Sequence, residues 1–427
     1  MFKGIKDAFR VKELRDKILF TIGMLLLYRF GAHLPVPGIP VQGMLEAYKN
    51  AGDQQNFMTV LNLFSGGALS RVSVFCLGIM PYITAEIIMQ MMQAVIPSLA
   101  EMQKEGEAGQ RKVKQYTRYL TIGLATLNAI GYLFLFKGQF GITFNESVPA
   151  WLMNFIVVFS MVTGAIIIMW MGEVMTQRGI GNGMSLIIFA NIMSGLPMAF
   201  ATANMNKGTQ GLVITLVTVL IIVAVIPIIV YIERGQRRIP IQYAKRVQGR
   251  RVLGGQATYL PIKVNTAGVV PIIFASAILY FPAQIAVFFP QVGWMQSFAN
   301  AVSTGWVNWI LSCIFIVFFA YFYTAMVFNP DDTADNLRKQ GGFIPGVRPG
   351  AATSAYIQST LDHITLPGAL FMAFIAIVPS MIFTVTGNPI IQAFGGTSIL
   401  IMVGVALDTL SQIESQLQMH HYDGFFK

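Results

Sequence analysis

The residue types that could support chemistry are few in this chain, and the first of them is a glycine-rich segment. Gly179-Ile-Gly-Asn-Gly183 is similar to a phosphate-binding loop, but no strand precedes it and the lysine of a P-loop is missing. It lies between two apolar runs, where glycines and an Asn cap are ordinary turn chemistry. We therefore interpret the segment as a turn between two helices.

Histidines and cysteines do not suggest a metal or catalytic site. The four histidines have no cysteine or carboxylate at ligand spacing. They are His33, His363, His420 and His421. Cys76 and Cys313 lie inside apolar runs without paired spacing, as small buried hydrophobic residues do. Nucleophile elbows and zinc-binding helices are also missing. We expect no metal, no cofactor and no enzymatic activity.

Carboxylates within apolar runs are the remaining candidates, because an unpaired charge in lipid is costly. Glu173, Asp408 and Glu414 lie near the ends of such runs, where water is within reach. Only Glu86 lies deep inside one. A carrier that couples solute to ions would need several such groups near the middle of the membrane. A single carboxylate argues against that class.

The composition indicates that most of the chain lies in lipid. Charged residues make up 11% of the 427 residues and hydrophobic residues 55%, whereas a soluble domain has about 25% charged residues. Runs of about 20 apolar residues predict membrane-spanning helices, and they are too long for barrel strands. Ten such runs lie near 18–32, 73–97, 119–137, 150–172, 184–200, 211–232, 267–289, 306–328, 364–386 and 397–413.

Basic residues give the orientation of these spans. With the N-terminal tail in the cytoplasm, 24 of the 29 lysines and arginines fall on the cytoplasmic side, as the positive-inside rule requires. An even number of spans places both termini there. Residues 1–17 have no cleavage site after them and predict an amphipathic helix on the membrane surface. Residues 418–427 form a cytoplasmic tail.

The position of the 201–210 connection predicts two inverted halves. Five spans precede it (18–200) and five follow it (211–417), so the halves enter the membrane from opposite sides. In transporters, this arrangement places a pathway between the halves. We therefore predict an all-α polytopic membrane protein of ten helices, with 201–210 as its hinge.

Three connections are too long to be simple turns. The outer stretch that ends at Asn62-Leu-Phe-Ser-Gly-Gly67 suits either a capped surface helix or a short re-entrant helix enclosed by protein. Two cytoplasmic arms, 233–263 and 329–362, carry basic residues on turn-rich segments. The first predicts a hairpin or an extended arm with its tip near Gly249-Arg250-Arg251, and the second predicts a rigid turn that presents Arg348. The positive-inside rule would explain the basic residues of these arms, but not their length and turn-rich sequence. A large docking partner would explain all three features.

Seven segments share motifs with one family, in order and at the same spacing. They are Asn62-Leu-Phe-Ser-Gly-Gly-Ala68, Leu77-Gly-Ile-Met-Pro-Tyr-Ile83, Lys104-Glu-Gly-Glu107, Gly179-Ile-Gly-Asn-Gly183, Arg238-Ile-Pro-Ile-Gln-Tyr-Ala-Lys-Arg246, Gly341-Gly-Phe-Ile-Pro-Gly346 with Arg348-Pro-Gly350, and Gly395-Gly-Thr-Ser398. With these segments the chain resembles the SecY family of protein-conducting channels, from its N-terminal helix through the tenth span.

The resemblance implies a clamshell with a lateral gate between spans two and three of one half and seven and eight of the other. It also implies a re-entrant plug helix formed by Asn62, Leu63, Phe64, Ser65, Gly66, Gly67 and Ala68. A hydrophobic pore ring would consist of Ile79, Ile83, Ile188, Ile192, Ile273 and Ile401. Such a ring repels water and ions. Ordinary packing between helices would explain any one of these isoleucines alone.

The resemblance also implies partners and a location. Arg250, Arg251 and Arg348 would engage the ribosome or the SecA motor ATPase, and the channel would assemble with SecE and SecG. Its substrates would be unfolded polypeptides that carry signal sequences, and its surroundings the lipids of a bacterial inner membrane. Glu86 departs from the small or apolar residue that the family places in this part of the gate.

Overall fold

The computed structural model describes residues 9–39, 65–138, 148–205, 208–243, 246–248, 251–253, 257–288, 292–303, 305–386 and 395–423. Most of them are helical. The helices are α2 (Lys12–Gly31), α5 (Met80–Val95), α6 (Pro97–Lys104), α7 (Glu107–Gly138), α8 (Ala150–Arg178), α9 (Gly183–Met205), α10 (Gly208–Glu233), α11 (Val270–Phe288), α12 (Gly293–Ser303), α13 (Gly305–Val327), α14 (Pro330–Lys339), α15 (Ala351–Thr386) and α17 (Gly396–Asp423). The strands are β1 (Gln236–Tyr243), β2 (Arg246–Gln248), β3 (Arg251–Leu253), β4 (Ala257–Lys263) and β5 (Gly342–Phe343).

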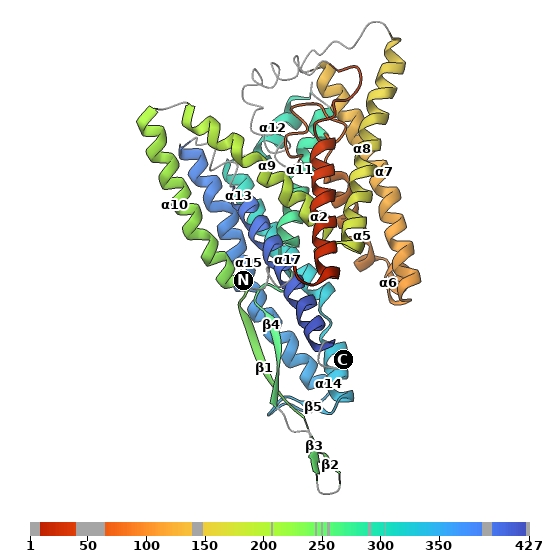
Figure 1. Ribbon diagram of the computed structural model, residues 1–427, viewed down its shortest axis with the longest axis vertical. Coiled ribbons are helices and arrows are strands. Elements are labelled where there is room, and N and C mark those ends of the chain that lie inside the picture. Colours follow the sequence, from red (N-terminus) through yellow and green to blue (C-terminus); the bar gives the residue numbers. More distant parts are fainter. Residues whose placement is uncertain are drawn as a thin grey trace.

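The long helices lie side by side, and the strands project from one end of the bundle together with α14 (Figure 1). We call that end the arm side. Helices α2, α5, α7 and α8 pack together on one side of the bundle, and α10, α13 and α15 lie on the other. The halves meet where α11 contacts α5 and α7, and where α17 contacts α2 and α9.

The helical class predicted from the sequence is confirmed. In the described residues, six helices are long and apolar enough to span a membrane. The other four predicted spans coincide with α2, α5, α9 and α11, which do not meet that length or composition there, so the count of ten stays a prediction. Residues 12–17, expected in a separate surface helix, belong to α2. The expected hinge falls where α9 ends and α10 begins.

The start of the second span differs from the prediction. We expected it near residue 73, but α5 begins at Met80, and residues 65–79 form turns. Gly66 and Gly67 have φ of +64° and +84°, which end any helix there, and Pro81 stands in the first turn of α5. This irregular stretch is largely buried, which is the condition under which a membrane protein tolerates non-helical backbone.

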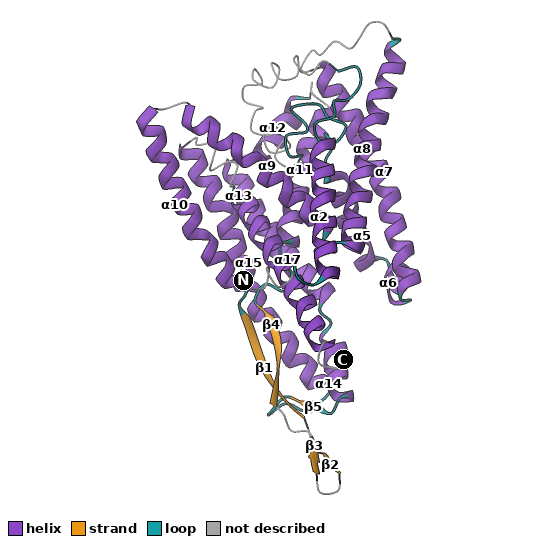
Figure 2. Cartoon of the chain, viewed as in Figure 1, coloured by secondary structure: helices purple, strands orange, loops and turns teal. Residues whose placement is uncertain are grey.

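The predicted hairpin of the first arm is confirmed, because β1 pairs antiparallel with β4 and β2 with β3. The sequence did not predict that the two arms join. Strand β5 from the second arm pairs with β1, and the result is one sheet in the order β4-β1-β5 (Figure 2). Ile239 and Ile241, alternate residues of β1, are buried in one cluster with Ile357 and Leu361 of α15. The arms are therefore one folded unit.

Candidate pore constriction and plug

The six isoleucines predicted for the ring come together in one buried apolar cluster. Their side chains are between 0% and 8% exposed, with Ile401 at 0%. In one half, Ile79 immediately precedes α5, Ile83 lies on α5, and Ile188 and Ile192 lie on α9. In the other half, Ile273 lies on α11 and Ile401 lies on α17. The cluster therefore crosses the contact between the halves. It also contains many other apolar residues, so membership alone does not assign a ring.

Local helix geometry sets the direction of each isoleucine pair. Ile188 and Ile192 are one turn apart on α9, so they share a face. Ile79 immediately precedes α5, and its carbonyl accepts the backbone N–H of Ile83 at 3.1 Å. These two side chains are therefore also one turn apart. Each pair therefore shares one face, as the sequence spacing predicted, and both pairs belong to the shared cluster.

The predicted plug is described only in part, since Asn62, Leu63 and Phe64 lie outside the described residues. Ser65 to Ala68 form turns rather than the expected helix, because both intervening glycines have positive φ. Ala68 is fully buried in the same apolar cluster as the six isoleucines. The end of the predicted plug thus belongs to the same cluster as the residues that it is predicted to seal.

A polar contact holds this turn to two helices. Arg29 of α2 donates from Nη1 to the carbonyl of Gly66 at 2.9 Å and to Ser194 Oγ of α9 at 3.0 Å. A Cβ atom on Gly66 would lie 2.5 Å from Asn191 Oδ1 and 2.9 Å from Arg29 Nη1. Only glycine fits here. The sequence did not predict this contact of Arg29.

The glycine segment 179–183 is a helix junction, as predicted. Asn182 Oδ1 accepts the backbone N–H of Met184 at 3.0 Å, which caps α9. The segment also joins the halves, because the N–H of Gly181 donates to Gln412 Oε1 of α17 at 2.9 Å. The N–H of Ile180 donates to Thr21 Oγ1 of α2 at 3.1 Å. These contacts on the arm side were not predicted.

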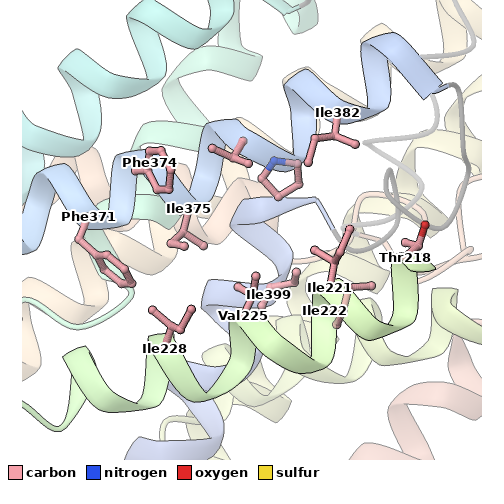
Figure 3. Close-up of a pocket in the computed structure, with 12 residues that line it drawn as sticks. Thr218, Ile221, Ile222, Val225, Ile228, Phe371, Phe374, Ile375, Ile382 and Ile399 are labelled. Carbon is pink, nitrogen blue, oxygen red and sulfur yellow. The ribbon is translucent and has the colours of Figure 1, made fainter. Parts of the chain in front are cut away.

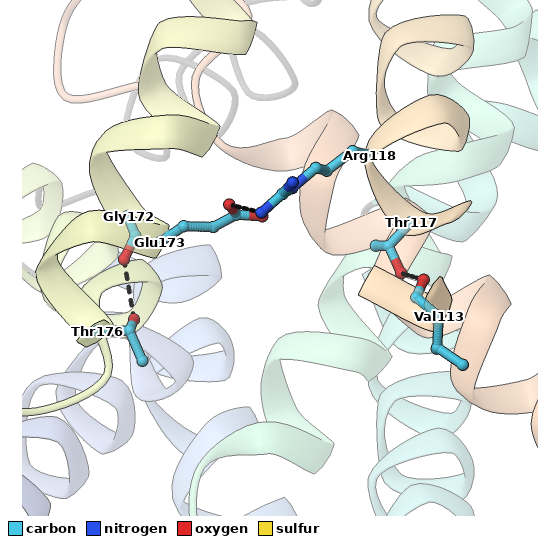
Figure 4. A network of polar contacts seen from close by, with 6 residues as sticks. All are labelled: Val113, Thr117, Arg118, Gly172, Glu173 and Thr176. Carbon is cyan, nitrogen blue, oxygen red and sulfur yellow. Dashed lines mark hydrogen bonds and ion pairs between the residues drawn. The ribbon is translucent and has the colours of Figure 1, made fainter. Parts of the chain in front are cut away.

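Glu173 has a partner that the sequence did not reveal. Arg118 of α7 donates from Nε to one carboxylate oxygen at 2.9 Å and from Nη2 to the other at 2.6 Å (Figure 4). The Glu173 side chain is only 15% exposed, so it is stabilised mainly by this two-bond pair rather than by water. The pair links α7 to α8 within one half. Glu86 is half-buried on α5.

The arginines of the arms are described unequally. Arg348 is exposed in the turn after β5, where Gly346 and Gly350 have positive φ and the Arg348 carbonyl accepts Thr353 Oγ1–H at 2.8 Å. This agrees with the predicted rigid turn. Arg251 begins β3, but its side chain is outside the description, and Arg250 lies outside the described residues altogether.

Comparisons with known proteins give the family. Residues 73–410 match SecY. The chain is 44% identical to the protein translocase subunit SecY of Streptomyces lividans and 43% identical to that of Mycobacterium bovis, with 100% of both chains covered in each case. The chain belongs to the SecY family.

Solved structures agree with the fold of a SecY chain. A protein-conducting channel superposes with a TM-score of 0.62 at 19% identity, covering 93% of this chain and 91% of the other. Sec61 from the canine ribosome-channel complex gives a TM-score of 0.58 at 18% identity with the same coverage. The SecY fold thus provides the frame for the ring and the plug, whose roles in this chain stay predictions.

Substituting alanine at Gly66 should disturb the plug. Gly66 and Gly67 both have positive φ, so alanine costs roughly 1–2 kcal/mol at either position. Only at Gly66 does the new Cβ also collide with Asn191 and Arg29, whereas at Gly67 it meets open space. We expect Gly66→Ala to leak ions at rest, measured as conductance of reconstituted channels. Gly67→Ala is the matched control. Equal conductance in both variants and the parent would show that this contact does not seal the pore.

Proposed function

We propose that this SecY chain forms the pore of a protein-conducting channel, through which unfolded polypeptides with signal sequences cross the membrane. The observation that carries this proposal is the apolar cluster that both halves build together. It contains the six isoleucines and Ala68 of the plug. A narrow apolar constriction keeps out water and ions without binding a passing polypeptide through charges. A solute carrier would instead need a polar site between its halves.

The same arrangement supports a lateral gate that releases transmembrane segments into lipid. Spans two and three correspond to α5 and α7, and spans seven and eight correspond to α11 and α13. Helix α11 contacts both α5 and α7 across the division between the halves. Separation of these helices would open a path from the pore to the bilayer. The gate therefore lies where the halves already meet through side-chain packing.

The partners and the orientation follow from charge and from the relatives. SecE, SecG and the motor ATPase SecA are the proposed bacterial partners, since the curated relatives are named as subunits of a translocase. The ribosome is a further partner, and related channels have been solved in complexes with it. We place the chain in a bacterial inner membrane with both termini and the arms in the cytoplasm, because 24 of its 29 basic residues then lie on that side.

Replacing Ile401 by asparagine tests the pore. Ile401 is 0% exposed, and an amide without partners in a dry ring costs about 1–3 kcal/mol. Opening lets water hydrate the amide, so the penalty falls on the closed state and opening becomes more frequent, about tenfold for each 1.4 kcal/mol. Substrates with weak signal sequences should then be exported better. Export of a weak-signal and a strong-signal substrate is measured at matched protein levels.

Val405 provides the control for this experiment. It lies one turn further along α17 in the same cluster and is 3% exposed, but it is not a predicted ring residue. Val405→Asn should destabilise the protein and lower export of both substrates alike. If Ile401→Asn also lowers both equally, Ile401 is a packing residue and the proposed ring is wrong.

Charge reversal on the arms tests the docking proposal. Arg348 is exposed on a rigid turn, so Arg348→Glu together with Arg250→Glu and Arg251→Glu should weaken binding of SecA or ribosomes, most strongly at low salt. Arg338→Glu, on α14 of the second arm, is the control, because Arg338 already pairs with Asp335 at 3.4 Å. The measurement is cosedimentation with each partner. Unchanged binding of both partners to the triple variant would exclude this surface.

A further inference from the structure

An apolar groove between α10 and α15 is separate from the predicted gate. Its inner part is a cavity of about 280 Å³, with Ile399 of α17 as part of its lining (Figure 3). Val225 and Ile228 face it from α10, and Phe371 and Phe374 from α15. All the lining side chains except that of Thr218 are apolar. The groove therefore offers contacts only to an apolar group.

A second cavity, of about 990 Å³, continues the groove toward the arm side. It shares Phe371 with the first cavity, and it is lined by Tyr231 and Arg234 at its end. From Thr218 to Arg234 the groove follows 16 residues, or roughly 24 Å of helix at 1.5 Å per residue. It thus runs from a polar end deep into the bundle.

The exposure of α10 shows that the groove opens on the outside of the bundle. Only 11% of the most apolar part of this helix is buried by the rest of the protein. Tyr231 is 82% exposed, and tyrosines at such positions mark the boundary between hydrocarbon and head groups. Arg234 follows within one turn, so its guanidinium lies at the level of lipid phosphates. The opening of the groove is therefore at head-group depth.

Arg234 is available to an anion. Its side chain is exposed, and among the described residues no carboxylate forms an ion pair with it. The neighbouring Glu233 forms no ion pair with it, and Glu233 Oε1 instead accepts a hydrogen bond from Asn265 Nδ2 at 2.8 Å. Arg237 is exposed at the start of β1 and adds positive charge nearby. The end of the groove is thus cationic while its walls are apolar.

We propose that this groove is a binding site for an anionic phospholipid, with the phosphate on Arg234 and one acyl chain between α10 and α15. One leaflet of hydrocarbon is roughly 15 Å thick, half of the core. Val225 lies nine residues from Arg234, or about 13 Å along the helix, so the chain reaches the inner cavity.

The test compares two lipids with identical chains. Purified protein in detergent is titrated with dioleoyl phosphatidylglycerol or dioleoyl phosphatidylcholine, and bound lipid is counted by native mass spectrometry. We expect phosphatidylglycerol to bind more tightly, and Arg234→Gln to weaken it about fivefold, as one basic residue near a membrane surface does. Val225→Trp, which fills the inner cavity, should weaken both lipids. Arg178→Gln is the control, because it removes another exposed arginine, at the end of α8, that lines neither of these cavities.

The proposal is overturned if the two lipids bind equally, or if Arg234→Gln and Arg178→Gln weaken phosphatidylglycerol to the same extent. A further measurement tests whether another protein occupies the groove. A cysteine introduced at Ile228 is exposed to a membrane-soluble cross-linker in the assembled complex within native membranes. Cross-links to a partner subunit would show that a protein helix occupies the groove. Cross-links to lipid alone would support the proposal, and they do not depend on whether the protein conducts polypeptides.

Discussion

Backbone hydrogen bonding is the constraint on which the rest of this structure depends, because lipid hydrocarbon cannot satisfy an N–H or C=O group. Long helices meet this constraint through the hydrogen bonds of their own backbone. The turns between residues 65 and 79 meet it with bonds to each other and to the preceding loop. The N–H of Val74 donates to Leu34 O and that of Val36 to Val72 O, both at 2.9 Å. The turn of the predicted plug can therefore lie inside the protein without being a helix.

The same constraint explains which contacts hold the predicted plug in place and join the halves. Arg29 satisfies the Gly66 carbonyl and links α2 to α9. On the arm side, Gly181 donates to Gln412 across the halves. The halves also meet through the apolar cluster that contains the six isoleucines, and where Leu14 and Ile180 pack with Ile413 of α17. The contact between them thus combines a large non-directional apolar surface with a hydrogen bond of defined geometry, which helps to fix the position of one half on the other.

The sequence could predict the features that depend on local pattern. Apolar runs predicted the helices, alternation of polar and apolar residues predicted the β1–β4 hairpin, and Asn182 predicted the cap of α9. Features that need distant segments to meet were missed. The pairing of β5 with β1, the Arg118–Glu173 pair and the contacts of Arg29 each join residues whose separation in sequence carries no periodic signal. The irregular start of the second span was missed because its residues are as apolar as those of a membrane-spanning helix.

Under the proposed function, the apolar cluster between the halves also determines which molecule can open them. Exposing it to water costs roughly 25 cal/mol for each Å² of apolar surface. Exposing it to another apolar segment costs little, because one apolar contact replaces another and no hydrogen bond of the cluster is lost. A polar or charged segment offers no such exchange. If the polypeptide path passes through this cluster, the hydrophobic core of a signal sequence lowers the free energy of opening by occupying the surface that opening exposes. Ions and water remain excluded, because exposing the apolar surface of the cluster to water costs free energy.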